Sequence, residues 1–485
     1  MKLFPQGVVR ILSSGAGLFA FLCCTGRVSG QTAPGSYSRP WHANAEERIK
    51  ADAKDFRDLR FRVDSARTYS LAELVDVAES HNPETRLAWE RARAQAAVLG
   101  IARSELYPVL TAAALSSTRR QEVYLQTRFY RQTIQNFEAA LDLNYTVFDF
   151  GARSGRINAA KAEVLAANFA FNDVHRQIIY RVEHAYYQLL NAAGQEDAAR
   201  ASLSNAQAVQ QAAEERLNDG LATLPDVLEA RSATAQAEYE LQAVLGAEQV
   251  AQGDLATSLG TSPTIAILVQ PLKELSIPDA IADSVEAAIN RALTQRPDLL
   301  QQLAQIRSAN ARVKEARSTF YPVMNINAQP AGQSLYGLQQ TFPWGHTAGL
   351  TGGLTLSLKW TVFDGGARRN NLAQAQANQR AAQAHLDATS DQIADEVWAA
   401  YSNLNTAFRQ RQSAEALLEA SSKSYDAALD SYNYGLRNFL DVTAAQRTLA
   451  QARSADVLAR TQVLSATADL AFQTGDAVQP TATVP

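Results

Sequence analysis

Two kinds of hydrophobic periodicity alternate along this chain of 485 residues. From Ser70 to Leu106 apolar residues recur with the period of an amphipathic helix, and His81-Asn82-Pro83 interrupts the pattern. Ser70 followed by Glu73 is a capping-box sequence, which predicts that the helix begins there. A second segment of this kind is interrupted at Gln295-Arg296-Pro297. The sequence therefore predicts a broken helix early in each half of the chain.

A period of two follows each of these helical segments. The alternating apolar positions are Leu141, Leu143, Tyr145 and Val147 in one stretch, Met324, Ile326 and Ala328 in another, and Leu354, Leu356, Leu358, Trp360 and Val362 in a third. Polar residues stand between them, so each stretch predicts a strand with one apolar and one polar face. A less regular strand follows Pro108. We expect two strands in each half, joined by polar loops at about 119–136 and 330–348.

Very long helices come next. No proline occurs from Ala152 to about Asn218 or from Ala367 to about Tyr434. An unbroken helix of that size would be roughly 100 Å long. Each ends near a glycine, and a further helix is predicted at about 225–259 and at about 439–473. Apolar residues are spaced as in a coiled-coil seam at Val182, Tyr186, Leu189 and Ala193, and again at Val397, Tyr401, Leu404 and Phe408.

The elements occur twice in the same order because the sequence itself is repeated. The segment Val147–Arg153, with the sequence VFDFGAR, returns 215 positions later (149 to 364) as Val362–Arg368, with the sequence VFDGGAR. Tyr107-Pro108 returns as Tyr321-Pro322. This distance is far too long for a solenoid repeat. We interpret it as one large structural half that occurs twice, at about 70–275 and 276–475.

The chain begins with a segment typical of an export signal, residues 1–30. It contains an apolar stretch from Leu12 to Cys24, and the small residues Val28-Ser29-Gly30 form a candidate cleavage site. Cys23 and Cys24 are the two cysteines of the chain, so cleavage after Gly30 would leave none. Lipidation of Cys23 or Cys24 is the alternative. We expect residues 31–69 to form a charged arm and residues 476–485 a disordered tail.

Composition narrows the function classes. The net charge is −4 and there is no basic stripe, which argues against binding to nucleic acid. The six histidines are scattered without the spacing of metal ligands. No Walker loop, Gly-x-Ser-x-Gly or His-Glu-x-x-His sequence occurs. We therefore expect neither an enzyme nor a protein that carries a cofactor or metal.

An exported chain with alternating strands and long polar helices is typical of an outer-membrane barrel protein. A barrel in lipid must close, since an open edge leaves unpaired backbone groups. Four strands cannot close, because the smallest such barrels have about eight. Three copies would supply about twelve strands and a matching tube of helices. The predicted fold is an α+β membrane protein, in which a long α-helical coiled-coil barrel continues into a transmembrane β-barrel shared by a homotrimer.

The two Tyr-Pro pairs, the two VFDxGAR segments and the two glycine-centred turns resemble those of the TolC-like outer-membrane efflux proteins. The resemblance covers about residues 70–475. It implies a trimeric channel-tunnel in the outer membrane with a long periplasmic extension, which works with a periplasmic adaptor protein and an inner-membrane pump. Such a channel is a passive exit duct, surrounded by outer-membrane lipid. Two alternatives are a type I protein-secretion duct and a periplasmic coiled-coil structural protein without a pore.

The resemblance also implies roles for residues near the second turn. It implies that Tyr432 and Arg437 bond to Asp226 of the first turn and hold the tunnel entrance closed. It implies that Asp441 lies on the inner wall, where three copies would form an acidic ring that attracts cations. Ala444 stands where some members carry a second acid, so the ring would be weaker. A simpler interpretation makes Asp226 and Asp441 acids that stabilise helix starts.

Glycines are expected to permit the sharp changes of direction. Gly220 and Gly435 should have the positive φ of a helix C-terminus, and by resemblance they contact the adaptor together with Leu221 and Leu436. Gly151, Gly365 and Gly366 should allow a strand to become a helix. Asp149 and Asp364 should cap the helices that begin there.

Overall fold

The structure is a computed structural model that describes residues 50, 64, 66–125, 127–278, 280, 284–339 and 342–476. The chain divides into two compact units, Met1–Arg60 and Phe61–Pro485, and all elements below belong to the second. Several predicted segments lie outside the described residues. They are the export signal with Cys23 and Cys24, nearly all of the arm at 31–69, and the tail after Asp476.

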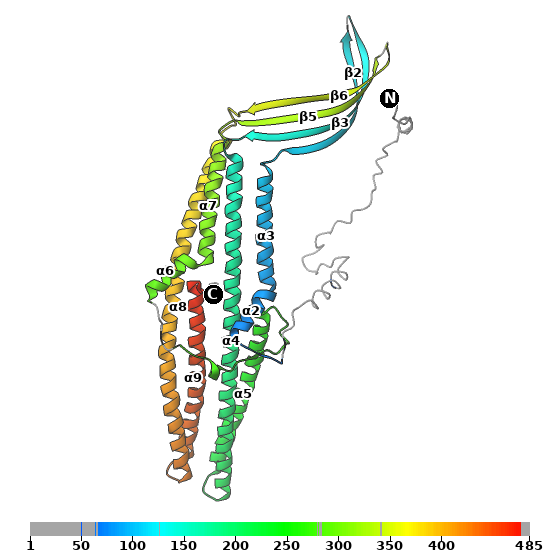
Figure 1. The fold of residues 1–485 in the computed structure, drawn as a ribbon. Coiled ribbons are helices and arrows are strands. Elements are labelled where there is room, and N and C mark those ends of the chain that lie inside the picture. The colour runs from blue at the N-terminus through cyan, green and yellow to red at the C-terminus, as the bar shows by residue number, and fades with distance from the viewer. Residues whose placement is uncertain are drawn as a thin grey trace, which may run out of the picture. The chain divides into compact units, whose positions relative to one another are not determined.

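The helices come in pairs of matching length. α2 (Leu71–His81) and α6 (Val285–Gln295) have 11 residues each, α3 (Pro83–Ser104) and α7 (Pro297–Ser318) have 22 each, α4 (Ala152–Asn218) and α8 (Ala367–Asn433) have 67 each, and α5 (Leu224–Ser258) and α9 (Phe439–Thr474) have 35 and 36. The long helices predicted from proline-free sequence are confirmed (Figure 1).

Prolines separate α2 from α3 and α6 from α7, as predicted. Pro83 and Pro297 are the first residues of α3 and α7, where a missing N–H breaks no helical hydrogen bond. The predicted capping box at the start of α2 is present. The backbone N–H of Ser70 donates to Glu73 Oε2 at 2.9 Å, and Glu73 N donates to Ser70 Oγ at 3.4 Å.

Seam residues of the long helices form the core. Val182 and Tyr186 of α4 are fully buried in a cluster that includes Leu74 of α2 and Leu255 of α5. On α8, Val397 is buried against α6, and Leu404 is buried against α9. The apolar spacing predicted for a coiled-coil seam therefore marks the buried face of both long helices.

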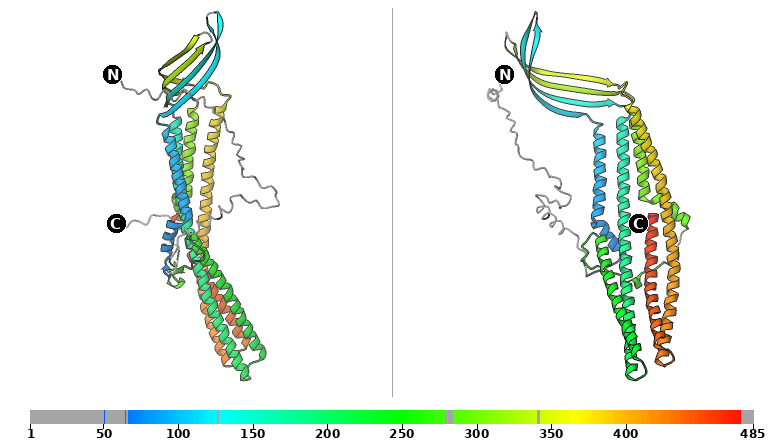
Figure 2. Two further views of the ribbon diagram at one scale, coloured as in Figure 1. Left: turned by 90° about the vertical axis from the view of Figure 1, so that its right-hand side faces the viewer. Right: turned by 180° about the vertical axis from the view of Figure 1, so that it is seen from behind.

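α4 is the central helix of the arrangement. It packs along α3, α5, α7 and α9, whereas α8 packs on α6, α7 and α9 (Figure 2). The segment between α5 and α6 contains β4 (Leu268–Val269) and the short helix η2 (Leu272–Glu274). β4 pairs in parallel with β1 (Thr68–Tyr69), just before α2. This pairing holds the segment between α5 and α6, which connects the two halves of the chain, beside the start of the first half.

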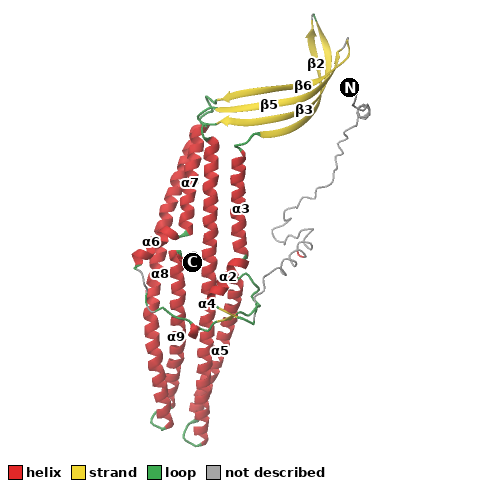
Figure 3. Cartoon of the chain, in the orientation of Figure 1, coloured by secondary structure: helices red, strands yellow, loops and turns green. Residues whose placement is uncertain are grey.

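Four strands form an antiparallel sheet at the ends of α3, α4, α7 and α8 (Figure 3). They are β2 (Val109–Leu125), β3 (Arg128–Phe148), β5 (Val323–Gln339) and β6 (Phe342–Lys359), in the order β2-β3-β5-β6. In the described chain β2 and β6 each have one neighbour and one unpaired edge. The sheet is therefore open at both sides.

The register gives this sheet one apolar and one polar face, as the alternation predicts. Leu356 lies opposite Ile326, which lies opposite Tyr145 on the next strand. On the other face, Asn327 Nδ2 donates to Asn144 Oδ1 at 2.7 Å. The leucines of the apolar face on β6 remain largely exposed, because nothing in the described part of the chain covers them; they are Leu354, Leu356 and Leu358.

The predicted polar loops at about 119–136 and 330–348 are wrong, because the strands continue through them. β2 extends to Leu125, and β3 starts at Arg128. The ladder bonds join main-chain groups, so polar side chains extend a strand wherever both faces are solvated. Gln121 and Gln132, for example, lie opposite one another, with Nε2 donating to Oε1 at 3.4 Å. Hydrophobic alternation therefore marks only the part of each strand that lies nearest to the helices.

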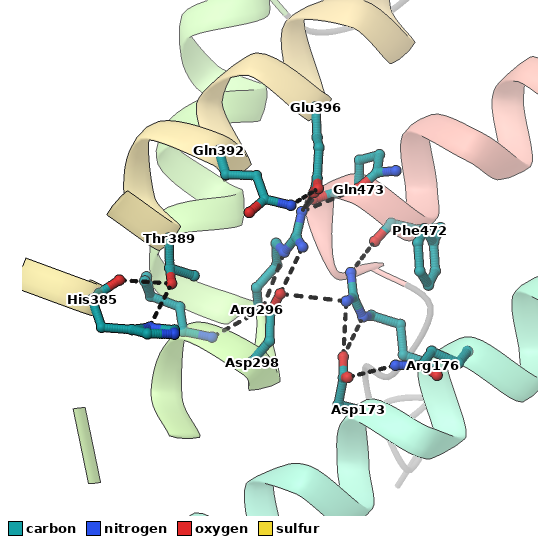
Figure 4. A network of polar contacts seen from close by, with 12 residues as sticks. Asp173, Arg176, Arg296, Asp298, His385, Thr389, Gln392, Glu396, Phe472 and Gln473 are labelled. Atoms are coloured by element: carbon teal, nitrogen blue, oxygen red, sulfur yellow. Dashed lines mark hydrogen bonds and ion pairs between the residues drawn. The ribbon is translucent and has the colours of Figure 1, made fainter. Parts of the chain in front are cut away.

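A buried polar network lies where α7 begins and α9 ends (Figure 4). Arg296, just before α7, donates from Nη2 to Asp298 Oδ2 at 2.6 Å. Its Nη1 donates to Glu396 Oε2 on α8 at 2.7 Å and to Gln473 Oε1 on α9 at 3.1 Å. Burial raises the pKa of Asp298, but the hydrogen bond and charge of Arg296 outweigh burial, so the pKa lies below its usual value.

Arg176 of α4 extends this network from the first half of the chain. Its side chain is only 3% exposed, and Nε donates to Asp173 Oδ1 at 2.9 Å. Nη1 donates to the carbonyl oxygen of Phe472 at 2.9 Å, and Cζ lies 4.2 Å from the centre of the Phe472 ring. Nη2 lies 3.6 Å from Asp298 Oδ2. The network thus connects α4, α7, α8 and α9.

Candidate functional site at the hairpin tips

A tight turn joins α4 to α5 at the first hairpin tip. Gly220 there has a φ of +70°. The N–H of Leu221 donates to the carbonyl of Arg216 at 2.7 Å, and the N–H of Gly220 donates to that of Leu217 at 3.0 Å. This pair of bonds is a Schellman motif, which satisfies two carbonyls at the end of α4.

The second tip, between α8 and α9, is built in the same way. Gly435 has a φ of +75°. Leu436 N donates to Ser431 O at 2.8 Å, and Gly435 N donates to Tyr432 O at 2.9 Å. Asn438 then starts α9 by accepting a hydrogen bond from Asp441 N at 3.0 Å.

Both tips expose large apolar side chains. Leu221 is 68% exposed and Leu436 is 79% exposed. Further exposed apolar residues of the tips are Leu224, Leu228, Tyr434 and Leu440. Exposed apolar groups gathered in this way are typical of a surface that contacts another protein.

The two acids expected at the gate both lie in the first turn of a helix. Asp226 Oδ2 accepts hydrogen bonds from the N and Oγ1 of Thr223, at 2.9 and 2.7 Å, which completes a capping box. Asp441 is partly exposed, and its Oδ2 lies 4.0 Å from Arg437 Nη1. Within one chain, no hydrogen bond joins Tyr432 or Arg437 to Asp226 among the described residues, and Thr223 donates both of its bonds to Oδ2 of that carboxylate. In this geometry both acids stabilise helix starts.

Tyr432 is packed between the two hairpins. The residue is 5% exposed, and its hydroxyl is buried without a partner in the described chain. Burial raises the pKa of this hydroxyl and the charge of Asp226 adds to the effect, while the charge of Arg216 opposes it. Arg216 Nη1 donates to Tyr432 O at 2.9 Å. Sequence reasoning missed Arg216, whose only signal was a basic residue in the last turn of α4.

The two strand-to-helix junctions share another set of contacts. At the first, Asp149 accepts hydrogen bonds from Gly151 N at 3.2 Å, Arg153 N at 2.8 Å and Arg153 Nε at 3.1 Å. At the second, Asp364 accepts from Gly366 N at 3.1 Å, and from Arg368 N and Nε at 3.0 and 2.8 Å. The main-chain N–H of Arg368 is the largest cause of the lowered pKa of Asp364. Each aspartate thus caps the long helix that follows.

The junctions differ at one position. Gly365 has a φ of +65°, and Phe150 at the equivalent place has a φ of +51°. A side chain at positive φ is strained. The Phe150 ring stacks on Tyr321 at 5.0 Å between ring centres, and it also packs on Phe148. These ring contacts offset the strain at the first junction, whereas glycine avoids it at the second.

Among the described side chains, no group of three or more His, Cys, Asp or Glu is arranged to hold a metal ion. In the same part of the chain, every helix is too short or too polar to cross a bilayer.

Comparison with known proteins decides the family. Residues 74–261 and 288–476 both match the profile of the outer membrane efflux proteins, and together they cover most of the chain. The chain belongs to the outer membrane efflux protein family. This confirms the TolC-like family predicted from the sequence, and with it the outer-membrane location and the efflux role. The family consists of efflux channels rather than enzymes.

Relatives in the outer membrane efflux protein family match over most of their length. Protein CyaE of Bordetella pertussis is 28% identical over 395 residues, which are 81% of each chain. Outer membrane protein OprJ of Pseudomonas aeruginosa is 27% identical, over 85% of this chain and 86% of the relative.

Solved structures share the fold. The outer-membrane channel OprN aligns with a TM-score of 0.74 at 23% identity, over 84% of this chain and 91% of OprN. The outer membrane protein VceC of Vibrio cholerae aligns with a TM-score of 0.70 at 20% identity, over 84% of this chain and 96% of VceC.

Proposed function

We propose that three copies of this chain form the outer-membrane exit duct of an efflux system with an inner-membrane pump and a periplasmic adaptor protein. The four-stranded sheet, open at both edges, is the observation that carries this proposal. A lone sheet of this kind leaves unpaired backbone groups at β2 and β6, which lipid does not tolerate. Three copies bring the edges together in a twelve-stranded barrel, above the minimum of about eight strands.

The two faces of the sheet suit the wall of such a barrel. The exposed leucines of β6 and the residues opposite them meet lipid, and the face with Asn144, Asn327 and Thr355 lines a water-filled lumen. The paired helices continue the lumen as a coiled-coil tube. Matching helix lengths and the two-part family match support a duplicated half in each chain, so that six similar helical units surround the tube.

The hairpin tips are the docking place for the adaptor in this proposal. Gly220 and Gly435 set the turns, and Leu221 and Leu436 are the exposed side chains beside them. The proposed contact is tested by photo-crosslinking from position 221 or 436 in cells that contain the cognate adaptor. A crosslink to the adaptor is expected at the tips, and none from Leu350, an exposed residue of the sheet.

We also propose that the pore entrance lies at the same tips. Asp441 is proposed to form a three-membered acidic ring at a gate where Asp226, Arg437 and the ring of Tyr432 also lie. In planar bilayers Asp441→Asn is expected to weaken block by divalent cations, because the ring loses three charges. Unchanged block would contradict the ring.

Small molecules are the proposed cargo. Two relatives are the toluene efflux pump outer membrane protein TtgF and the pyoverdine export outer membrane protein OpmQ of Pseudomonas putida. Their names favour small-molecule efflux over protein secretion for this chain. A strain without the gene should become sensitive to small toxic compounds while its secreted proteins stay unchanged. The opposite pattern would support the secretion duct.

The proposed trimer is tested directly on the full chain, expressed together with residues 1–30, the predicted export signal. Light scattering in detergent should give the mass of three protomers, and planar bilayers should show ion-conducting steps. A monomer that stays soluble without detergent would contradict the proposal and favour a structural protein of the periplasm.

A further inference from the structure

The ends of the two hairpins lie side by side (Figure 1), and one side chain joins them. Arg216, in the last turn of α4, donates from Nη1 to the carbonyl oxygens of Tyr432 at 2.9 Å and Asn433 at 3.3 Å. Those residues end α8. Carbonyls at a helix C-terminus lack intrahelical partners and carry the negative end of the helix dipole. A guanidinium is therefore well suited to bind there.

The same guanidinium also lies against an aromatic ring. Arg216 Cζ is 4.5 Å from the centre of the Tyr432 ring, within the range of a cation–π contact. The ring is buried among apolar residues of both hairpins, which include Val227 of α5 and Phe439 of α9. Arg216 thus binds a main-chain group and a side chain of the opposite hairpin at once.

One donor of Arg216 is left unsatisfied. Its Nε is buried without a partner in the described chain. An unmet buried donor costs free energy that exposure to water recovers. The contact is therefore held, yet less tightly than a fully bonded guanidinium would be, which suits a contact that must open and close.

The repeat makes this contact one-directional. The position equivalent to Arg216 in the second half is Ser431 (216 plus 215), and the position equivalent to Tyr432 in the first half is Leu217 (432 minus 215). A second hairpin therefore cannot hold a first hairpin in the same manner. Another bond between the hairpins, from Arg447 Nη2 to Glu229 Oε1 at 3.2 Å, is exposed and therefore weak.

We propose that Arg216 is the positioning residue that holds the two hairpin tips of each chain together and keeps the entrance closed. This rests on the proposed function, because it assumes that the tips surround the pore. The bond runs to the main chain and the ring face of Tyr432, not to its hydroxyl. The hydroxyl is therefore dispensable, in contrast to the role that the family resemblance implies.

Single-channel recording of the full-length trimer tests this proposal. Arg216→Ala should shift the closed-to-open ratio by about tenfold, equivalent to about 1.4 kcal/mol. Tyr432→Phe should match the wild type, because the ring and the carbonyl remain. Tyr432→Leu should open the channel partly, because the ring face is lost. Arg447→Ala, which removes the exposed bond between the same hairpins, is the matched control and should change little.

Two outcomes would overturn the proposal. One is an unchanged closed-to-open ratio in Arg216→Ala. The other is a Tyr432→Phe variant that opens as much as Arg216→Ala, which would return the lock to the hydroxyl. Arg216→Lys, which retains the charge, serves if the alanine variant fails to assemble, and should give an intermediate ratio. A wild type that forms no channels would instead contradict the proposed function itself.

Discussion

A single dihedral angle separates the glycines of the tips from glycines inside the helices. Gly435 has a φ of +75°, whereas Gly246 lies within α5, and an added Cβ would meet nothing within 4 Å at either position. Gly435→Ala should therefore destabilise the fold by about 1–2 kcal/mol through backbone strain alone. Gly246→Ala should stabilise it by up to about 1 kcal/mol through helix propensity. Thermal melting in detergent compares them, and shifts in the same direction would contradict this account.

Glu183 on α4 predicts a pH dependence. Its Oε2 is buried without a partner in the described chain, and burial raises the pKa from 4.5 to about 7. Because the folded-state pKa of Glu183 is raised, its protonated carboxyl contributes fully to the stability of the fold below about pH 4.5. This contribution is lost as pH rises through about 7. Glu183→Gln should stabilise the protein at pH 8 by about 1–2 kcal/mol, allowing for partial exposure, and not at pH 4.

Melting curves at the two pH values measure this difference. The control is Glu419→Gln, at an exposed carboxylate paired with Lys423 on the same helix. It should show no comparable gain at pH 8. An equal gain for Glu183→Gln at both pH values would disprove the titration.

Residue contacts at the tips show where sequence reasoning stops. The turn glycines and the helix-capping aspartates follow from local chemistry, and the structure places them as expected. The contact between Arg216 and Tyr432 could not be predicted from the sequence, because Arg216 binds main-chain carbonyls of a distant segment. Every residue has such carbonyls, so no side chain marks the acceptor. The bonds from Thr223 to Asp226 Oδ2, by contrast, are local, because the two residues lie three positions apart.

At the scale of the elements, helices α4 and α7 approach each other closely at Gly155. A Cβ at Gly155 would lie 2.8 Å from Glu315 Cβ and 2.9 Å from Glu315 Cα on α7. Since those atoms belong to or adjoin a helix backbone, the helices would have to separate. Gly155→Ala should cost about 1–3 kcal/mol. Gly100→Ala on α3, which has open space around it, is the control for melting experiments, and equal effects would contradict the close crossing.

The accuracy of prediction also differs between kinds of element. The ends of α4, α5, α8 and α9 were predicted closely, because proline, glycine and a long apolar period mark a helix independently of its neighbours. The strands proved longer than predicted, because pairing depends on a partner strand rather than on the side chains alone. Residues near Arg119 and Thr133 pair through the main chain although the pattern there is polar.

For the molecule as a whole, the network around Arg296 is the junction of the two halves. Replacing Arg296 by methionine leaves the half-buried carboxylates of Asp298 and Glu396 without their main partner. This should cost about 1–3 kcal/mol, less than for a fully buried pair, because solvent screens part of the lost attraction. The lowered pKa of Asp298 means that its contribution is present above the unfolded pKa and is lost as pH falls through the folded value. The cost of Arg296→Met should therefore shrink on acidification.

Melting between pH 7 and pH 3 tests this expectation. Arg200→Met is the control, because Arg200 is exposed and pairs with Glu196 one turn away on the same helix. It should cost less than about 1 kcal/mol. Equal costs for the two variants, or a cost of Arg296→Met that does not vary with pH, would show that the network does not join the halves.

The two open edges of the sheet have a consequence for how the protein is made. Each newly exported chain carries β2 and β6 with one side unpaired, and such strands are templates for incorrect association. In the proposed trimer, maturation is then a meeting of separate molecules, so its rate rises steeply with the number of chains present. Correct assembly and aggregation draw on the same backbone groups. Slow synthesis and escort by a chaperone should therefore raise the yield of working channels more than any increase in the stability of a single chain.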